Sequence, residues 1–282
     1  MEWMEALKQS VKYMEEHIFD DISVEDVARH VNISSFYLQR GFSIVTGYTM
    51  GEYLRSRRLY LAAMDLLTTD EKVIDIAYKY CYETPESFTK AFIRFHGVSP
   101  IQIRLQSHKL HTFLPLTIKL IVEGGNSMDY RIEKMDAFKV MGLGRKFHMD
   151  TAYLKIPKYW DEFYELYQGK KDVSIVGMFG VCIDDENESK EFTYMIADLY
   201  KDGEVPEGFQ VVDIPAYTWA KFRCVGPLPG ALQAVNTRIF NEWLPGNHEH
   251  EIAAGINIEM YTRGDTCSAD YISEIWIPVK KK

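Results

Sequence analysis

The spacing of apolar residues changes near residue 112, and this change predicts two domains of different class. Before it, apolar positions recur every three or four residues in short segments, which is typical of packed helices. Two later segments, 156–167 and 228–244, keep helical spacing, but the rest of the second part predicts strands. The expected strands are 116–122, 130–133, 139–143, 174–181, 192–197, 210–214, 219–225, 256–261 and 271–279. The order strand, helix, strand, strand occurs twice, which predicts a multi-domain chain with an all-α domain followed by an α+β domain of two similar halves.

The boundary between the two domains is placed by a turn signal. Residues 124–127 are Gly-Gly-Asn-Ser, which favours a turn between the first two strands, so the helical domain must end earlier. We expect domains at 1–108 and 112–282, with His108 and His111 at their junction. With 282 residues, of which 46% are hydrophobic, the chain can form two packed cores.

An internal repeat organises the helical domain. In each copy a short helix, 24–31 or 73–80, leads through a turn into a second helix. Two helices joined by a tight turn form a helix-turn-helix unit, whose second helix can enter the major groove of DNA. The repeat therefore predicts a double helix-turn-helix. Its spacings are Leu38-x-x-x-Phe42-x-x-x-x-Gly47 and Phe88-x-x-x-Phe92-x-x-x-x-Gly97, preceded by Val27-Ala28 and Ile76-Ala77.

Cap and turn residues support this interpretation. Ser23, three residues before Asp26, is close to a capping box for the helix at 24–31, and Thr84 followed by Pro85 is a start signal for the last recognition helix. Asn32 stands at the first turn and tolerates a left-handed backbone. Cys81 stands at the second turn and predicts a distorted backbone there. We interpret its thiol as a small buried apolar group rather than a redox sensor.

The net charge of −9 is unevenly distributed along the chain. Residues 1–111 carry 13 basic and 15 acidic side chains, whereas residues 112–282 carry 19 and 26. Between residues 29 and 60 Glu52 is the single acidic residue, and this segment predicts a strip that faces DNA phosphates. The basic residues of this strip are Arg29, Arg40, Arg55, Arg57 and Arg58.

Other classes of protein and site are not indicated. The chain begins without a basic region followed by an apolar run and has no apolar stretch of membrane-spanning length, so we expect a cytoplasmic protein that does not insert into membranes. The four cysteines are far apart and fit neither a disulfide framework nor a zinc site. His248 and His250 lie in a polar stretch with no third ligand nearby. We therefore expect no metal and no cofactor.

The first domain resembles the DNA-binding region of AraC/XylS-type bacterial activators over residues 5–106. The resemblance implies two recognition helices in successive major-groove segments on one face of DNA, joined by a linker helix at 50–67. The residues that carry it most specifically are Ala77, Ser87, Phe88, Phe92, Gly97, Val98, Ser99 and Pro100.

Transferring family positions onto this chain predicts the DNA contacts. An Arg can bridge N7 and O6 of guanine, a Gln can pair with adenine, and a Phe can touch a thymine methyl group. The expected contacts are Ser35, Phe36, Gln39 and Arg40 in the first recognition helix, Arg55 in the linker helix, and Thr84, Glu86, Ser87 and Lys90 in the second. Each polar residue among them has the alternative of a solvated helix face, and Glu86 has that of a helix cap.

The second domain resembles the GyrI-like effector-binding domain of Rob-like regulators. The matching stretches are 128–147, 156–167, 211–232, 239–245 and 271–279. The resemblance implies a pocket between the two halves, lined by aromatic residues and one or two acids, with a glutamate at the position of Glu274.

The residue pattern of the last two strands supplies candidates for this pocket. With a period of two, Glu259 and Tyr261 share one face of their strand, and Glu274 and Trp276 share one face of theirs. A buried carboxylate needs a cationic partner, so we expect a cationic or amphipathic effector. An exposed sheet face or an internal salt bridge is the alternative for both acids. The candidate ligand residues are Glu274, Glu259, Tyr261, Trp276, Trp219 and Trp160.

Together these features predict a transcription regulator, more consistent with an activator than a repressor. Its expected partners are double-stranded DNA, a small effector of the lipophilic-cation class, and RNA polymerase. Two recognition helices in one chain can span two groove segments, so we expect a monomer or weak dimer. Two alternatives stay open for the second domain: a hydrolase with Glu259 or Glu274 as general base, and an architectural module without a ligand. No nucleophile motif or phosphate-binding glycine loop supports the first.

Overall fold

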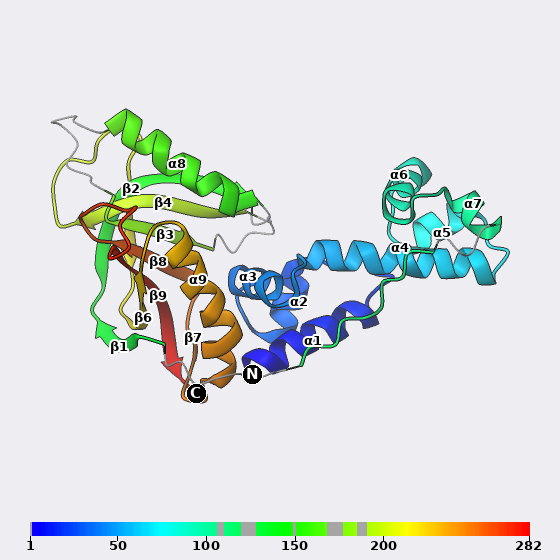
Figure 1. Cartoon of the computed structure of the whole chain (residues 1–282), viewed down its shortest axis with the longest axis horizontal. Coiled ribbons are helices and arrows are strands. Elements are labelled where there is room, and N and C mark those ends of the chain that lie inside the picture. Colours follow the sequence, from blue (N-terminus) through cyan, green and yellow to red (C-terminus); the bar gives the residue numbers. More distant parts are fainter. Residues whose placement is uncertain (1, 106–109, 120–127, 149–150, 168–176, 185–190) are drawn as a thin grey trace. The chain divides into compact units, whose positions relative to one another are not determined.

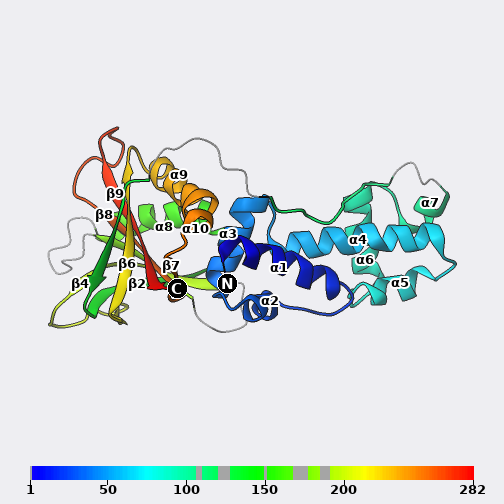
Figure 2. The same ribbon diagram turned by 90° about the horizontal axis from the view of Figure 1, so that it is seen from below.

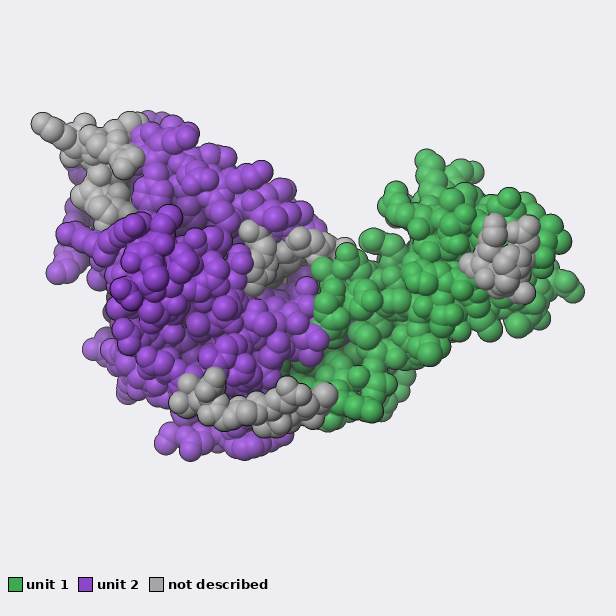
Figure 3. Space-filling view, in the orientation of Figure 1, with its two compact units in different colours: residues 1, 3–32, 46–119 green, residues 2, 33–45, 120–282 purple. Residues whose placement is uncertain are grey.

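The computed structural model describes residues 2–105, 110–119, 128–148, 151–167, 177–184 and 191–282. The chain forms two compact units (Figure 3): residues 1, 3–32 and 46–119 make up the first, and residues 2, 33–45 and 120–282 the second. The segment 33–45, which the sequence places in the helical domain, thus groups with the second unit. The domain limits of 1–108 and 112–282 stay predictions.

The first unit is all-helical. Ser23 and Asp26 form a complete capping box at the start of α2, and the Thr84 hydroxyl accepts a hydrogen bond from the Ser87 N–H at the start of α6. Both predicted caps are confirmed. The helices are α1 (Trp3–Glu16), α2 (Val24–Val31), α4 (Met50–Thr68), α5 (Val73–Lys79), α6 (Pro85–His96) and α7 (Pro100–Leu105).

The long helix α4 is the axis of this unit (Figures 1 and 2). Helices α5, α6 and α7 gather around its C-terminal half, where they bury a shared apolar cluster. The cluster contains the repeat positions Ile76, Ala77, Phe88 and Phe92, none of which has exposed surface. The repeated spacing therefore marks core residues, as we expected from the sequence.

The second unit is built on one antiparallel sheet, which carries α3 (Ser35–Thr46) and the C-terminal helices. Its strand order is β1-β6-β9-β8-β3-β4-β2-β5, with β7 on the side of β9. The strands are β1 (Tyr130–Met135), β2 (Phe138–His148), β3 (Phe179–Ile183), β4 (Glu191–Tyr200), β5 (Gln210–Ile214), β6 (Tyr217–Val225), β7 (His250–Ile252), β8 (Ile256–Tyr261) and β9 (Ile272–Lys281). The helices are α8 (Ala152–Tyr167), α9 (Gly230–Arg238), the π-helix η3 (Ile239–Trp243) and α10 (Leu244–Gly246).

Two sharp corners connect the halves of the sheet. Strands β1 and β2 are separated by residues 136–137 alone, and β5 and β6 by residues 215–216, although each pair lies far apart in the strand order. A link of two residues spans only about 11 Å between strand ends. The sheet must therefore curl so that its two ends approach each other.

The concave side of this curl, here called the inner face, holds the main apolar core. Val140, Met195, Trp219 and Trp276 pack together there with residues from both halves. The opposite side, here called the helix face, is covered by α8 and the α9–η3 segment: Trp160 of α8 hydrogen-bonds Tyr194, and the Trp243 ring of η3 lies 4.9 Å from that of Phe222. The register of the strands places Tyr194 and Phe222 on the same side of the sheet.

The fold class predicted from the sequence is confirmed: an all-helical N-terminal region precedes an α+β domain in which strand, helix, strand, strand occurs twice. Strand β7 was missed because it has three residues. The expected strand at 116–122 is wrong for residues 116–119, which have no regular structure, and its remainder lies outside the described residues, as does the turn at 124–127. Within the described residues no helix is long and apolar enough to cross a membrane.

Candidate DNA-recognition helices and effector site

The second recognition helix, α6, presents its predicted contacts to solvent. Thr84, Glu86, Ser87 and Lys90 are all exposed. Thr84 and Ser87 also stabilise the helix start, because the Ser87 hydroxyl donates to the Thr84 carbonyl at 2.8 Å. Pro85, Glu86, Thr89 and Lys90 line an open depression of about 330 Å³. Glu86 lies in the first turn, where its charge also favours the helix dipole.

The arginines of the predicted basic strip have different surroundings in the structure. Arg55 is exposed on α4 and free to face a phosphate, whereas Arg57 is 4% exposed and forms an ion pair with Glu15 at 2.8 Å. The Arg58 guanidinium donates to the carbonyls of Ile18 and Asp20. The expectation of a phosphate-facing strip is therefore wrong for Arg57 and Arg58, which join α4 to α1 and to the loop after it.

The first recognition helix, α3, is placed differently from α6. Its predicted contacts Ser35, Gln39 and Arg40 are half-buried, and Phe36 is 1% exposed. The Arg40 guanidinium lies 5.8 Å from the centre of the Phe36 ring, a cation–π distance. Ser35 and Phe36 contact the sheet of the same unit through Asp184 and Phe192.

The register of β8 against β9 separates the candidate ligand residues into two groups. Glu259 pairs with Ile275, and Met260 pairs with Glu274. Because directly paired residues point to the same side of a sheet, Glu259 and Glu274 point to opposite sides. Tyr261 and Trp160 join Glu259 on the helix face, whereas Trp276 and Trp219 join Glu274 on the inner face.

Glu259 forms the centre of a buried cluster on the helix face, here called the Glu259 cluster: Glu259, Tyr194, Tyr261 and Trp160. Its carboxylate, in a side chain that is 8% exposed, accepts hydrogen bonds from the hydroxyls of Tyr194 and Tyr261, both at 2.8 Å. Trp160 donates its ring N–H to the Tyr194 oxygen at 2.9 Å, and its ring lies 4.9 Å from that of Tyr261. Burial, together with the Glu259 charge, raises the pKa of Tyr194 and of Tyr261 well above the ordinary value, so both stay neutral donors.

The Glu259 charge has no cationic partner among the described residues: its hydrogen bonds come from neutral hydroxyls. Asn257, on the same face of β8, has a buried side-chain oxygen that finds no hydrogen-bond partner within the described chain. Buried charges in folded proteins are usually paired, and buried polar atoms are usually hydrogen-bonded. The helix face thus presents a carboxylate without an ion-pair partner among the described residues, an unpaired acceptor oxygen on Asn257, and the aromatic rings of Trp160 and Tyr261.

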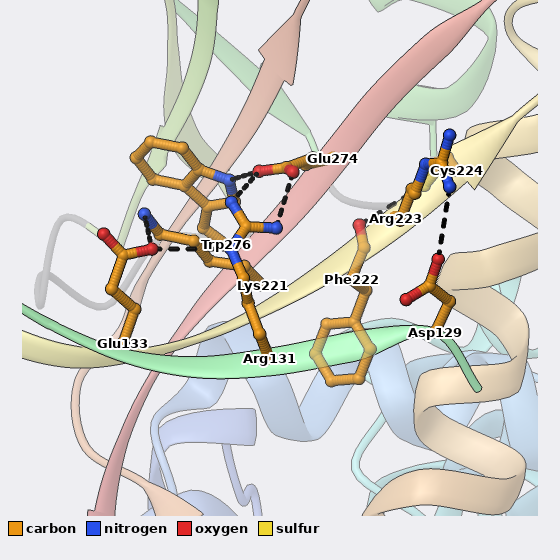
Figure 4. A network of polar contacts seen from close by, with 9 residues as sticks. All are labelled: Asp129, Arg131, Glu133, Lys221, Phe222, Arg223, Cys224, Glu274 and Trp276. Carbon is orange, nitrogen blue, oxygen red and sulfur yellow. Dashed lines mark hydrogen bonds and ion pairs between the residues drawn. The ribbon is translucent and has the colours of Figure 1, made fainter. Parts of the chain in front are cut away.

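Glu274, by contrast, is neutralised within the chain (Figure 4). The Arg131 guanidinium binds its two carboxylate oxygens at 2.7 and 3.0 Å, and the ring N–H of Trp276 donates at 2.7 Å. Burial raises the pKa of Glu274, but these partners outweigh burial and hold the pKa below its ordinary value. Lys221 lies 4.0 Å from the centre of the Trp276 ring and pairs with Glu133 at 2.8 Å. The internal salt bridge that the sequence left open as an alternative is what the structure shows for Glu274.

Sequence reasoning missed four residues that shape these two sites. Tyr194 stands in a predicted strand, but only the register shows that its hydroxyl reaches Glu259. Arg131 and Lys221 are basic residues in predicted strands, and no spacing rule connects them to Glu274. Gly180 leaves room for the Tyr194 hydroxyl, since a Cβ at this position would overlap it.

Comparison with known proteins finds a family match in each part of the chain. Residues 131–279 match the family model described as "Integron-associated effector binding protein", and residues 27–106 match that of a helix-turn-helix domain. The HTH-type transcriptional activator AarP of Providencia stuartii is 35% identical over 114 residues, which are 40% of this chain and 84% of AarP. The regulatory protein SoxS of Salmonella typhimurium is 36% identical over 104 residues, 37% of this chain and 97% of SoxS.

Among solved structures, SAV2435 bound to tetraphenylphosphonium is similar with 22% identity and a TM-score of 0.46, over 54% of this chain and 94% of SAV2435. The C-terminal domain of AraT, a response regulator from Geobacillus stearothermophilus, has 32% identity and a TM-score of 0.34, over 36% of this chain and 84% of that domain.

Proposed function

Because the chain belongs to the family of integron-associated effector binding proteins over residues 131–279, and to the AraC-type regulators in its helix-turn-helix region, we propose that it activates transcription in response to a lipophilic cation. It is a DNA-binding regulator with an effector-binding domain, and its families are those of regulators rather than enzymes. AarP, its relative in the first domain, is named as an activator, which supports activation here.

One observation supports the cationic effector: within the described part of the chain, the buried Glu259 carboxylate accepts hydrogen bonds from neutral hydroxyls and forms no ion pair. A cation close to this carboxylate would gain Coulomb energy in a poorly solvated environment, and its apolar surface would gain contact with the rings of Trp160 and Tyr261. Glu274 already has Arg131 and Lys221 beside it, so a second cation on the inner face would have to displace a cation of the protein.

This proposal makes Glu259, rather than Glu274, the first candidate for contact with the effector. The resemblance to Rob-like regulators points to the Glu274 position, whereas charge compensation points to Glu259. Tyr261 and Trp160 stay in the proposed site, and Trp276 and Trp219 contribute to the core of the inner face instead. For DNA, the proposed contacts are Ser35, Phe36, Gln39 and Arg40 of α3, Arg55 of α4, and Thr84, Glu86, Ser87 and Lys90 of α6.

A tryptophan-fluorescence titration with tetraphenylphosphonium tests the effector site, because the Trp160 ring belongs to the Glu259 cluster. We expect saturable quenching in the wild type and at least a tenfold weaker Kd in Glu259→Gln, which corresponds to about 1.4 kcal/mol. Tetraphenylborate has the same shape and the opposite charge, and it should not bind.

The matched control is Glu274→Gln, which removes the same charge from the other face of the sheet. Its Kd should stay within about threefold of wild type, a difference of about 0.7 kcal/mol. A loss of binding in Glu274→Gln with unchanged binding in Glu259→Gln would place the effector on the inner face. Equal binding of the cation and the anion would remove charge pairing from the proposal.

A further inference from the structure

The N-terminus of recognition helix α3 is held by an acidic residue of the sheet. Asp184 directly follows β3, and its carboxylate accepts a hydrogen bond from the Phe36 N–H at 3.2 Å and another from the Ser35 hydroxyl at 3.3 Å. The Asp184 N–H donates to the Gly255 carbonyl at 2.9 Å, which ties this residue to the start of β8. The carboxylate is therefore fixed by the sheet rather than by the helix.

Apolar contacts extend this attachment along the first turn of α3. The Phe36 ring lies 5.4 Å from that of Phe192 on β4, edge to face. The Tyr37 hydroxyl donates to the Ile256 carbonyl at 2.7 Å, and Tyr37 has no exposed surface. Three neighbouring residues of α3 thus each have a partner on the sheet.

The same part of α3 is the part expected to contact DNA. Helix N-termini bind phosphate groups through their free N–H groups and their positive dipole, and hydroxyl side chains assist. Asp184 supplies a negative charge and two acceptor oxygens to the N–H of Phe36 and the hydroxyl of Ser35, as a phosphate would. One set of donors cannot serve both anions, and the buried Phe36 ring cannot touch a base.

We propose that the sheet domain sequesters recognition helix α3, with the Asp184 carboxylate in the position of a DNA phosphate and Phe192 covering the base-reading Phe36. In this state the chain binds DNA through α6 alone. Release of α3 gives a second groove contact and a larger footprint. This inference rests on the proposed role of α3 in DNA recognition.

The Glu259 cluster lies close enough to α3 to influence the sequestered state. Phe192 and Tyr194 lie two residues apart on the same side of β4: the Phe192 ring contacts Phe36 of α3, and the Tyr194 hydroxyl donates to Glu259 at 2.8 Å. A cation bound at Glu259 would contact Tyr194, and a shift of Tyr194 would be passed to Phe192 beside it on the strand. The proposed effector therefore weakens the hold of the sheet on α3.

Footprinting on a duplex selected from a random library by the Asp184→Asn variant tests the sequestration. We expect wild type to protect one major-groove segment, and Asp184→Asn to protect two segments one helical turn apart, with at least tenfold tighter binding. Tyr37→Phe, which removes the bond to Ile256 without changing the charge, should act in the same direction. Asp213→Asn is the matched control, because Asp213 has a side chain that is 78% exposed on β5 and its loss changes the net charge equally.

Two further footprinting experiments distinguish a failure of this inference from a failure of the proposed function. Gln39→Ala in the Asp184→Asn background should return the footprint to one segment, which identifies α3 as the second contact. Tetraphenylphosphonium should extend the footprint of wild type but not that of Glu259→Gln. If Asp184→Asn and Tyr37→Phe leave both footprint and affinity at wild-type values, the sequestration is wrong, whatever the cation does. If the two variants extend the footprint but tetraphenylphosphonium does not extend that of wild type, sequestration holds and the effector proposal fails.

Discussion

At the scale of single residues, buried His96 in α6 makes folding sensitive to pH. Its Nε2 lies 3.1 Å from the Leu59 carbonyl, and its Nδ1 accepts from the His111 N–H at 3.2 Å. The neutral ring with a proton on Nε2 satisfies both contacts, and a second proton would face the N–H of His111. Burial lowers the pKa of His96 below its ordinary value of 6.5.

The unfolded chain therefore binds a proton at His96 more readily than the folded chain. The stability contributed by neutral His96 is complete above pH 6.5 and is lost as the pH falls below that value towards the folded pKa. We expect the free energy of unfolding to fall over this range, measured by urea denaturation. His96→Gln can keep both hydrogen bonds without titrating, and its pH dependence should be flatter; equal slopes for the two proteins would contradict the assignment.

Cys81 carries backbone strain at the second turn. Its φ of 62° is left-handed, where a side chain raises the energy by about 1–2 kcal/mol, while glycine also gains up to about 1 kcal/mol of entropy in the unfolded state. We expect Cys81→Gly to stabilise the protein by roughly 0.5–1 kcal/mol, seen as a higher urea midpoint. Cys81→Ala keeps the strained backbone and serves as the control for loss of the thiol, which lies 3.1 Å from the Phe19 carbonyl. A midpoint for Cys81→Gly below that of Cys81→Ala would show that the turn is not strained.

At the scale of elements, β3 must pass close to the side chains of its neighbours. A methyl group on Gly180 would overlap the Tyr194 hydroxyl and would lie 3.0 Å from the Glu259 carboxylate. We expect Gly180→Ala to destabilise the protein by about 1–3 kcal/mol and to weaken tetraphenylphosphonium binding, because Tyr194 must move away from Glu259. Calorimetry and the fluorescence titration measure the two effects, with Gly246→Ala, which meets no neighbouring atom, as the control.

Elements and their caps could be predicted from the sequence where local spacing determines them. The repeat of Phe88 and Phe92 identified the core of the second helix-turn-helix, and β5 and β8 have the predicted bounds. The division of Glu259 from Glu274 could not be predicted, because it depends on a register in which Met260 faces Glu274. A shift of one residue in that pairing would put both carboxylates on the same face, and no local pattern specifies it.

At the scale of the whole chain, the uneven charge gives the second part a role in DNA affinity. Residues 112–282 carry 26 acidic and 19 basic side chains, so this part of the chain is repelled by the phosphate backbone. This repulsion does not depend on sequence, so it weakens binding to random and to specific DNA alike. Base contacts must then supply a larger share of the affinity for a specific site.

The corners at residues 136–137 and 215–216 make the two halves of the sheet inseparable. Each corner passes the chain from one half to the other: β1 pairs with β6 while β2 pairs with β4, and β5 pairs with β2 while β6 pairs with β9. A half produced alone would lack its outer partner and expose an open strand edge, the arrangement from which identical chains exchange strands to form dimers. In the effector domain each half already pairs with the other half of the same chain. The two similar halves therefore need no second copy of the chain to complete the sheet.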